Sequence, residues 1–166
     1  MGLQYGVALR EAAESLASLA AGDKRGEVME YARATIINDC YNSNPKALDS
    51  MVRSLAEMPA KRRIVVAGEM LELGPGGEAM HRECGQSMGR QGIDFVVGVR
   101  GLARFIVEGA ADAQAAAKFV DTPENAGEWL KSNVQAGDVV LLKASRGVRL
   151  ERALEVWMGK SGDAPH

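Results

Sequence analysis

Along most of the chain, short and almost entirely apolar runs alternate with segments whose apolar residues recur at helical spacing. Such runs are typical of strands buried on both faces of a parallel sheet. They lie at residues 63–67, 94–99, 118–120 and 139–142. The amphipathic segments between and after them predict helices at about 45–57, 77–91, 101–110, 123–133 and 149–158. The alternation predicts an α/β fold: a Rossmann-like, doubly wound, mainly parallel sheet with helices on both faces.

The two ends of the chain have a different pattern. Residues 9–21 place leucine and alanine at helical spacing and predict a helix that Gly22 ends. Two short extended segments, 27–31 and 34–37, then lie close enough together to pair as a hairpin. The sequence therefore predicts that a helix and a hairpin-like strand pair precede the doubly wound part. Residues 159–166 read as a disordered tail.

Three chemically rich loops follow predicted strands, at 38–45, 68–76 and 143–147. In a doubly wound sheet, ligands bind outside the carboxyl ends of the strands. Because all three loops fall at such ends, we expect them to lie side by side at one edge of the sheet and to form a site there.

The 38–45 turn is rich in asparagine and also holds Asp39, Tyr41 and Ser43. Such residues suit a strand-to-helix turn, and Asn44 is a natural N-cap for a helix that begins at Pro45. Capping explains one or two of these polar residues and leaves the others. A carboxylate at the end of a strand can accept a hydrogen bond from a ribose hydroxyl, so the turn is equally well interpreted as a ligand site.

The other two loops offer charged groups. Lys143, Ser145 and Arg146 precede a predicted helix start, where free backbone N–H groups also attract anions, so they predict an anion-binding cluster. The alternative is a solvent-exposed basic loop. In the middle loop, Glu69 and Glu72 are candidate acid/base or metal-binding groups, although Glu72 is equally well a helix cap. His81 follows on a helix and is more typical of a hydrogen-bonding structural residue than of a catalyst.

Composition excludes several classes of function. The net charge of −2 and the sequence pI of about 5.8 argue against nucleic acid or a membrane surface as a partner. The one basic run, 61–63, reads as a solvated loop before a strand. Cys40 and Cys84 form neither a disulfide framework nor a zinc pattern, so no metal site is expected within the chain. With no signal sequence or membrane span in the pattern, a cytoplasmic location is expected.

Three motifs occur in a fixed order: NDCYNSNP at 38–45, AGEMLELG at 67–74 with His81 downstream, and KASRG at 143–147. Together they resemble the C-terminal domain of the Mur ligases over about residues 25–158. The resemblance implies a cytoplasmic enzyme that uses ATP and Mg²⁺ to join an amino acid or a dipeptide to a growing muropeptide through an acyl phosphate. The chain departs from the usual pattern at Ala144, where relatives have glycine, and at Glu69, where a related pattern has aspartate.

The resemblance also implies roles for residues. Asp39 is expected to contact the ATP ribose, and Arg25, Asn42 and Asn44 to line the nucleotide side of a cleft. Tyr41 is expected to face the incoming amine. The incoming substrate's carboxylate is expected to meet the three residues of the last motif, which are Lys143, Ser145 and Arg146. No role is implied clearly for the three candidates of the middle motif: Glu69, Glu72 and His81.

The chain contains no Gly-x-x-x-x-Gly-Lys-Ser/Thr phosphate loop. We therefore expect a fragment: residues 1–24 as the last helix and linker of a central ATPase domain, 25–158 as the C-terminal domain, and no tight ATP binding or turnover alone. Its expected partners are the missing domains, a UDP-muropeptide and D-alanyl-D-alanine, which the 41–45 string favours within the family. The alternatives are a nucleotide-binding regulatory module and a sister Mur or folate-type ligase.

Overall fold

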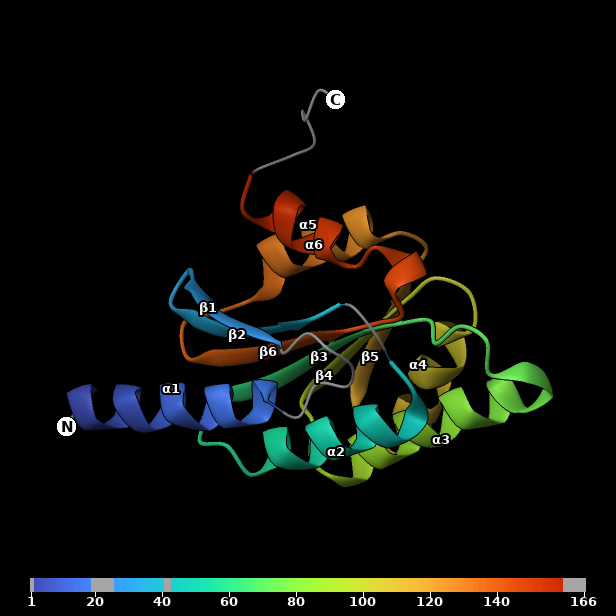
Figure 1. The fold of residues 1–166 in the computed structure, drawn as a ribbon, viewed down its shortest axis with the longest axis horizontal. Coiled ribbons are helices and arrows are strands. Elements are labelled where there is room, and N and C mark those ends of the chain that lie inside the picture. The colour runs from blue at the N-terminus through green and yellow to red at the C-terminus, as the bar shows by residue number, and fades with distance from the viewer. Residues whose placement is uncertain (1, 19–25, 41–42, 160–166) are drawn as a thin grey trace.

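The protein, seen in a computed structural model that describes residues 2–18, 26–40 and 43–159, is built on one six-stranded sheet (Figure 1). Its strands are β1 (Glu27–Tyr31), β2 (Ala34–Asp39), β3 (Arg62–Gly68), β4 (Phe95–Val99), β5 (Ala116–Val120) and β6 (Asp138–Lys143). Its helices are α1 (Gly2–Ala17), α2 (Pro45–Ala56), α3 (Gly77–Arg90), α4 (Ala103–Asp112), α5 (Pro123–Asn133) and α6 (Glu151–Trp157), with short 3₁₀ turns η1 (Gly74–Gly76) and η2 (Arg146–Val148).

The strands are arranged in the order β1-β2-β6-β3-β4-β5. Only β1 runs antiparallel, and it pairs with β2. The last strand in sequence, β6, lies in the middle, where it pairs with β2 through Asp39↔Lys143 and with β3 through Arg62↔Asp138. The predicted parallel sheet and the hairpin-like pair are therefore confirmed.

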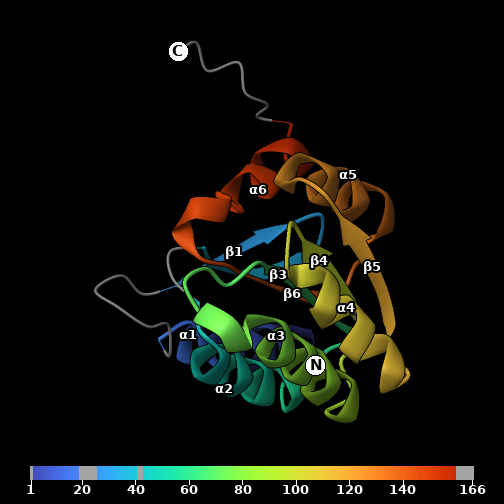
Figure 2. The same cartoon turned by 90° about the vertical axis from the view of Figure 1, so that its right-hand side faces the viewer.

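The side chains of the strands alternate between two separate cores. One core packs α1, α2, α3 and α4 against one face of the sheet, and the other packs α5 and α6 against the opposite face. Figures 1 and 2 show these helical layers on either side of the strands. Successive buried residues of β6, such as Val140 and Leu141, belong to different cores, as expected of a strand covered on both faces.

Two details differ from the prediction. The first helix begins at Gly2 and ends at Ala17, earlier than the predicted 9–21. Its last buried residues, Ala13, Leu16 and Ala17, lie in the same core as α2. The end of the helix is therefore set by this packing, which the spacing of apolar residues in the sequence does not show. In the hairpin, Ala32 and Arg33 both have positive φ, of 54° and 63°, which is the backbone of a tight two-residue turn.

Two helices begin at a capping residue, and the Asn44 cap was correctly predicted. Asn44 Oδ1 accepts a hydrogen bond from the Ala47 N–H at 2.8 Å, with Pro45 in the first turn of α2. Thr122 caps α5 in the same way. In the part of the chain that the structure describes, no helix combines the length and the apolar character that a membrane span requires.

Candidate functional site

The carboxyl ends of the strands form one edge of the sheet, where the loops after β2, β6, β3 and β4 meet. The loop after β6 leads to α6 on one face, whereas the loops after its neighbours β2 and β3 lead to α2 and α3 on the other. Loops that diverge in this way leave room for a ligand between them. The three loops expected to form a site are therefore adjacent in space.

The centre of this edge is an ion pair between Asp39 and Lys143. The Lys143 ammonium donates to Asp39 Oδ2 at 2.5 Å, and neither side chain has any exposed surface. The pair joins the last residues of β2 and β6, which are direct partners in the sheet. Asp39 Oδ1 has no hydrogen-bond partner among the described residues. A buried acceptor without a partner is costly and marks a place where a further donor is missing.

The turn after Asp39 contains a second such atom. Ser43 is buried, and its Oγ also lacks a partner in the described part of the chain. Before the turn, Asn38 Nδ2 donates to Glu27 Oε1 at 3.3 Å, and the Cys40 thiol donates to Asn38 Oδ1 at 2.8 Å. Three of the expected site residues, Arg25, Tyr41 and Asn42, lie outside the described residues.

Cys40 is not a reactive group in this arrangement. Burial, aided by the negative charges of Glu151 and Asp39, raises the pKa of its thiol well above the ordinary value. A thiol that stays protonated is a poor nucleophile. Cys40 therefore contributes packing and one hydrogen bond to the turn.

The three candidate residues of the 143–147 segment differ in their exposure. Lys143 is fully buried and Ser145 nearly so, whereas Arg146 is exposed. The helix predicted to begin at about residue 149 begins at Glu151, after the η2 turn and a left-handed Arg149 at φ 57°. The Val148 and Arg149 N–H groups donate to the carbonyls of Ser145 and Arg146 and so point into the turn.

The middle loop, residues 69–73, is held by its neighbours. Glu69 Oε2 accepts from the Leu102 N–H at 3.1 Å, at the start of α4. His81 is fully buried and accepts from the Met70 N–H at 2.9 Å through Nε2. Glu72 is exposed and has a positive φ of 63°. It caps no helix, since neither η1 nor α3 has a side-chain cap.

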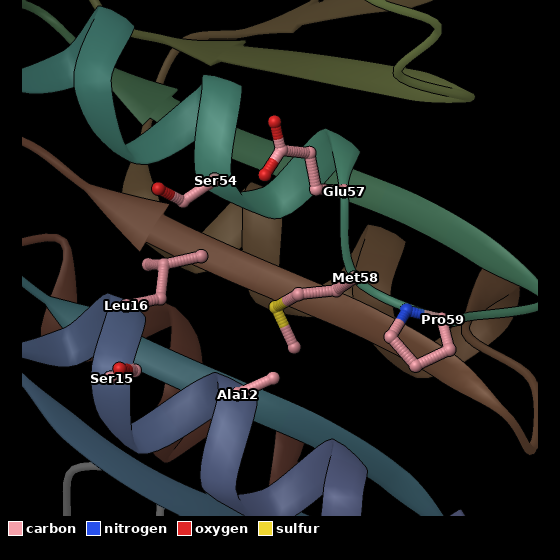
Figure 3. Close-up of a pocket in the computed structure, with 7 residues that line it drawn as sticks. All are labelled: Ala12, Ser15, Leu16, Ser54, Glu57, Met58 and Pro59. Carbon is pink, nitrogen blue, oxygen red and sulfur yellow. The ribbon is translucent and has the colours of Figure 1, made fainter.

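No resident metal site is evident in the described residues, where no three His, Cys, Asp or Glu side chains come together in a suitable group. A groove of about 430 Å³ lies elsewhere, between α1 and the end of α2 (Figure 3). Met58 and Pro59 line it on one side and Ala12 and Leu16 on the other. None of the expected site residues lines this groove.

Two residues of the edge escaped the sequence interpretation. Ser43 lay inside the turn motif but was given no role there. Arg100 follows β4, with a positive φ of 75°, and its Nη1 donates to the Gly147 carbonyl at 3.1 Å. It was missed because only three of the four loops at the carboxyl ends were considered, although the topological rule applies equally to the fourth.

The sequence profile described as "Mur ligase, glutamate ligase domain" matches residues 24–146. The chain belongs to the Mur ligase family. A curated relative from Bacillus subtilis (strain 168), named UDP-N-acetylmuramoyl-tripeptide–D-alanyl-D-alanine ligase, is 31% identical over 159 residues, which cover 93% of this chain and 35% of the relative. The family resemblance inferred from the three motifs is thus confirmed.

Solved structures of Mur ligases share the fold. The crystal structure of MurF ligase from Thermotoga maritima in complex with ADP superposes with a TM-score of 0.70 at 31% identity, covering 86% of this chain and 32% of that one. A MurF structure from Acinetobacter baumannii gives a TM-score of 0.72 at 24% identity, covering 80% and 30%, and supports the fold alone. The chain spans about a third of the length of these Mur ligases.

Proposed function

We propose that this chain is the C-terminal domain of an ATP- and Mg²⁺-dependent ligase that joins D-alanyl-D-alanine to a UDP-muropeptide in peptidoglycan synthesis, through an acyl phosphate. The observation that carries the proposal is the buried Oδ1 of Asp39, which has no hydrogen-bond partner among the described residues and lies at the carboxyl edge of a Mur ligase domain. The name of the Bacillus subtilis relative supports the choice of dipeptide and muropeptide.

Asp39 is the proposed contact to the ATP ribose. Its Oδ2 is occupied by Lys143, so a ribose hydroxyl would donate to Oδ1. Because Asp39 has no exposed surface, the turn has to rearrange when the nucleotide enters. Arg25, Asn42 and Asn44 would line the nucleotide side, and Asn44 would do so while its Oδ1 caps α2. ATP itself supplies the phosphoryl group that activates the muropeptide carboxylate.

The incoming dipeptide would meet Tyr41, Ser145 and Arg146. Arg146 is the exposed cation of the last motif and would bind the dipeptide's carboxylate directly. Lys143 would act from beneath, since it is buried and its ammonium is held against Asp39. In this proposal the middle-loop residues Glu69 and His81 shape the wall of the site rather than touch substrate.

In this proposal residues 25–158 act with a central domain that carries the phosphate loop and most Mg²⁺ ligands, and residues 1–24 are the last helix and linker of that domain. The sharpest test is a fusion in which this chain replaces the matching third of the Bacillus subtilis relative. The fusion should release phosphate from ATP only when both UDP-muropeptide and D-alanyl-D-alanine are present. The 166-residue chain alone should show no turnover.

Three results would count against the proposal. Robust turnover by the chain alone would refute the requirement for a further domain. Calorimetry offers an independent check, because the isolated chain is expected to bind ATP and D-alanyl-D-alanine only weakly. Tight binding of a different nucleotide would favour a regulatory module, and turnover of the fusion with another amino acid in place of the dipeptide would favour a sister ligase.

A further inference from the structure

Among the contacts of the middle loop, residues 69–73, three reach different parts of the fold, namely α3, the loop after β6 and the start of α4. The Met70 N–H donates to His81 Nε2 on α3 at 2.9 Å, and the next N–H, of Leu71, donates to Ser145 Oγ at 2.9 Å. The Glu69 carboxylate accepts from the Leu102 N–H at 3.1 Å. The amides of Met70 and Leu71 are adjacent in the backbone. The bond from Met70 to His81 therefore also places the Leu71 N–H that binds Ser145.

The contacts of His81 define its chemical state. Its Nδ1 lies 2.6 Å from the Gly77 carbonyl, which can only accept, so Nδ1 carries a hydrogen. Its Nε2 accepts from an amide and therefore carries none. The ring is neutral and in one tautomer. Burial lowers the pKa of His81 from its ordinary 6.5, although the bond to Gly77 and the Glu69 carboxylate oppose part of this shift.

The contact to Leu71 also sets what Ser145 can offer. A hydroxyl group has one hydrogen to donate and two lone pairs. Since the Leu71 N–H already binds one lone pair of the oxygen, the hydrogen of Ser145 is left for an acceptor. An acceptor with negative charge, such as a carboxylate, forms the stronger bond to it.

We infer that His81 is a positioning residue, which fixes Met70 so that the Leu71 N–H holds Ser145 with its hydroxyl hydrogen available to the carboxylate of the incoming substrate. This inference rests on the proposed function, because it takes Ser145 to be a substrate contact. The geometric part, that His81 orders the loop and Ser145, can be tested without any substrate.

If His81 is protonated at Nε2, that N–H points at the Met70 N–H, and two donors meet without an acceptor. The ordered loop requires the neutral ring, so its stability is fully present above pH 6.5 and is lost as the pH falls from 6.5 through the lowered pKa. Two charged residues of the described chain bear on this titration. Glu69 acts on the ring, whereas Arg82, on the same helix, is paired with Glu108 and Asp112 of α4.

The test uses amide hydrogen exchange by NMR in the 166-residue chain. His81→Leu removes the acceptor and should lower the protection of the Met70 and Leu71 amides at least tenfold. His81→Gln keeps one acceptor and one donor and should restore most of the protection. Wild-type protection, corrected for intrinsic exchange, should fall below pH 6.5, whereas that of His81→Gln should not. Met88→Ala, which removes a buried side chain from the same helix, is the matched control and should leave the loop protected relative to the rest of the domain.

Unchanged protection of Met70 and Leu71 in His81→Leu would overturn the inference, and so would a protonated wild-type ring at pH 7 in the nitrogen spectrum. The ring measurement needs no variant and decides the question even if His81→Leu does not fold. In the fusion enzyme, His81→Leu should raise KM for D-alanyl-D-alanine about tenfold with a smaller change in kcat, and an unchanged KM would remove the link to substrate. A wild-type fusion without dipeptide-dependent turnover would count against the proposed function alone, because the exchange experiment does not depend on it.

Discussion

The central strand β6 begins and ends on an ion pair, and the two pairs differ in how completely they are satisfied. At the amino end, Asp138 meets Arg62 of β3, and at the carboxyl end, Lys143 meets Asp39 of β2. Both pairs join residues that are direct partners in the sheet. The two pairs therefore allow the amino and carboxyl edges of the same sheet to be compared directly.

At the amino end every oxygen of the carboxylate is bound. Arg62 Nε donates to Asp138 Oδ1 at 3.1 Å, and Nη2 donates to Oδ2 at 2.7 Å. The same Nη2 donates to the Asn133 carbonyl, and the Gln135 N–H donates to Oδ2. This two-pronged geometry needs the planar fork of arginine. The network is closed and offers nothing to a ligand.

At the carboxyl end the cation is the ammonium group of Lys143 instead of a guanidinium group. Lys143 reaches Asp39 Oδ2, and Oδ1 is left without a partner in the described residues. Both side chains are fully buried, whereas about a third of the Arg62 side chain is exposed. Among the described residues, the carboxylate is therefore fully bound at the amino edge and only half bound at the carboxyl edge, which is the edge where ligands bind in doubly wound sheets.

The largest effect is expected from breaking the incomplete pair. Lys143→Met keeps most of the side-chain volume but leaves the Asp39 carboxylate buried without its cation. Removing one partner of a buried pair costs about 3–5 kcal/mol. The free energy of unfolding from urea denaturation should fall by that amount.

The double variant Lys143→Met, Asp39→Asn is the control for this prediction. It removes both charges, so it should recover a large part of the stability that the single variant loses. A loss below about 1 kcal/mol in Lys143→Met, typical of an exposed pair, would show that the pair is not buried as described.

Much of the fold followed from the sequence because strong periodicity and capping residues agree. The apolar runs predicted four of the strands, and Asn44 marked the start of α2. The tight turn at Ala32 and Arg33 carries no turn signal, since neither residue favours positive φ. The end of α1 also could not be read from spacing, because the core that it joins includes α2 and β2.

The sequence predicted that the loops lie at one edge of the sheet, but it did not predict the contacts between their residues. Motif order located Asp39 and Lys143 at one edge, yet nothing in the spacing reveals that they bind each other across 104 positions. Likewise the basic run at 61–63 was interpreted as a solvated loop. The structure corrects this, because Arg62 begins β3 and binds Asp138, and Arg63 donates to the Leu55 and Met58 carbonyls. Only the fold brings such partners together.

A smaller effect is expected at the complete edge. Arg62→Met should lower the free energy of unfolding by about 1–3 kcal/mol, because Asp138 keeps its bond to the Gln135 N–H while one oxygen loses its donor. The loss should be less than that of Lys143→Met under the same urea titration. In the fusion enzyme, Arg62→Met should leave KM for ATP unchanged, whereas Asp39→Ala should raise it. An equal change in KM for ATP in Arg62→Met and Asp39→Ala would contradict a role in ATP binding that is specific to the carboxyl edge.

The smallest effect is expected in the alkylation rates of the two thiols. Cys40 lies at the carboxyl edge of the sheet, and Cys84 lies on α3. Burial raises the pKa of Cys84 on α3 to about 12, so this thiol is protonated at pH 8 while the protein is folded. Burial also raises the pKa of the Cys40 thiol well above its ordinary value. Alkylation of either thiol therefore requires local opening.

We expect Cys40 to open when the turn after β2 moves, because Cys40 directly follows the last residue of β2 at the start of that turn. Opening at Cys84 requires that α3 separates from its neighbours, and α3 packs so closely on α4 that a Cβ at Gly85 would lie 1.9 Å from the Ile106 carbonyl oxygen. We therefore expect iodoacetamide to label Cys40 several-fold faster than Cys84, with the sites of labelling resolved by peptide mass spectrometry. Faster labelling of Cys84 would mean that the carboxyl edge is the more rigid of the two regions, and that the unpaired atoms of Asp39 and Ser43 do not weaken it.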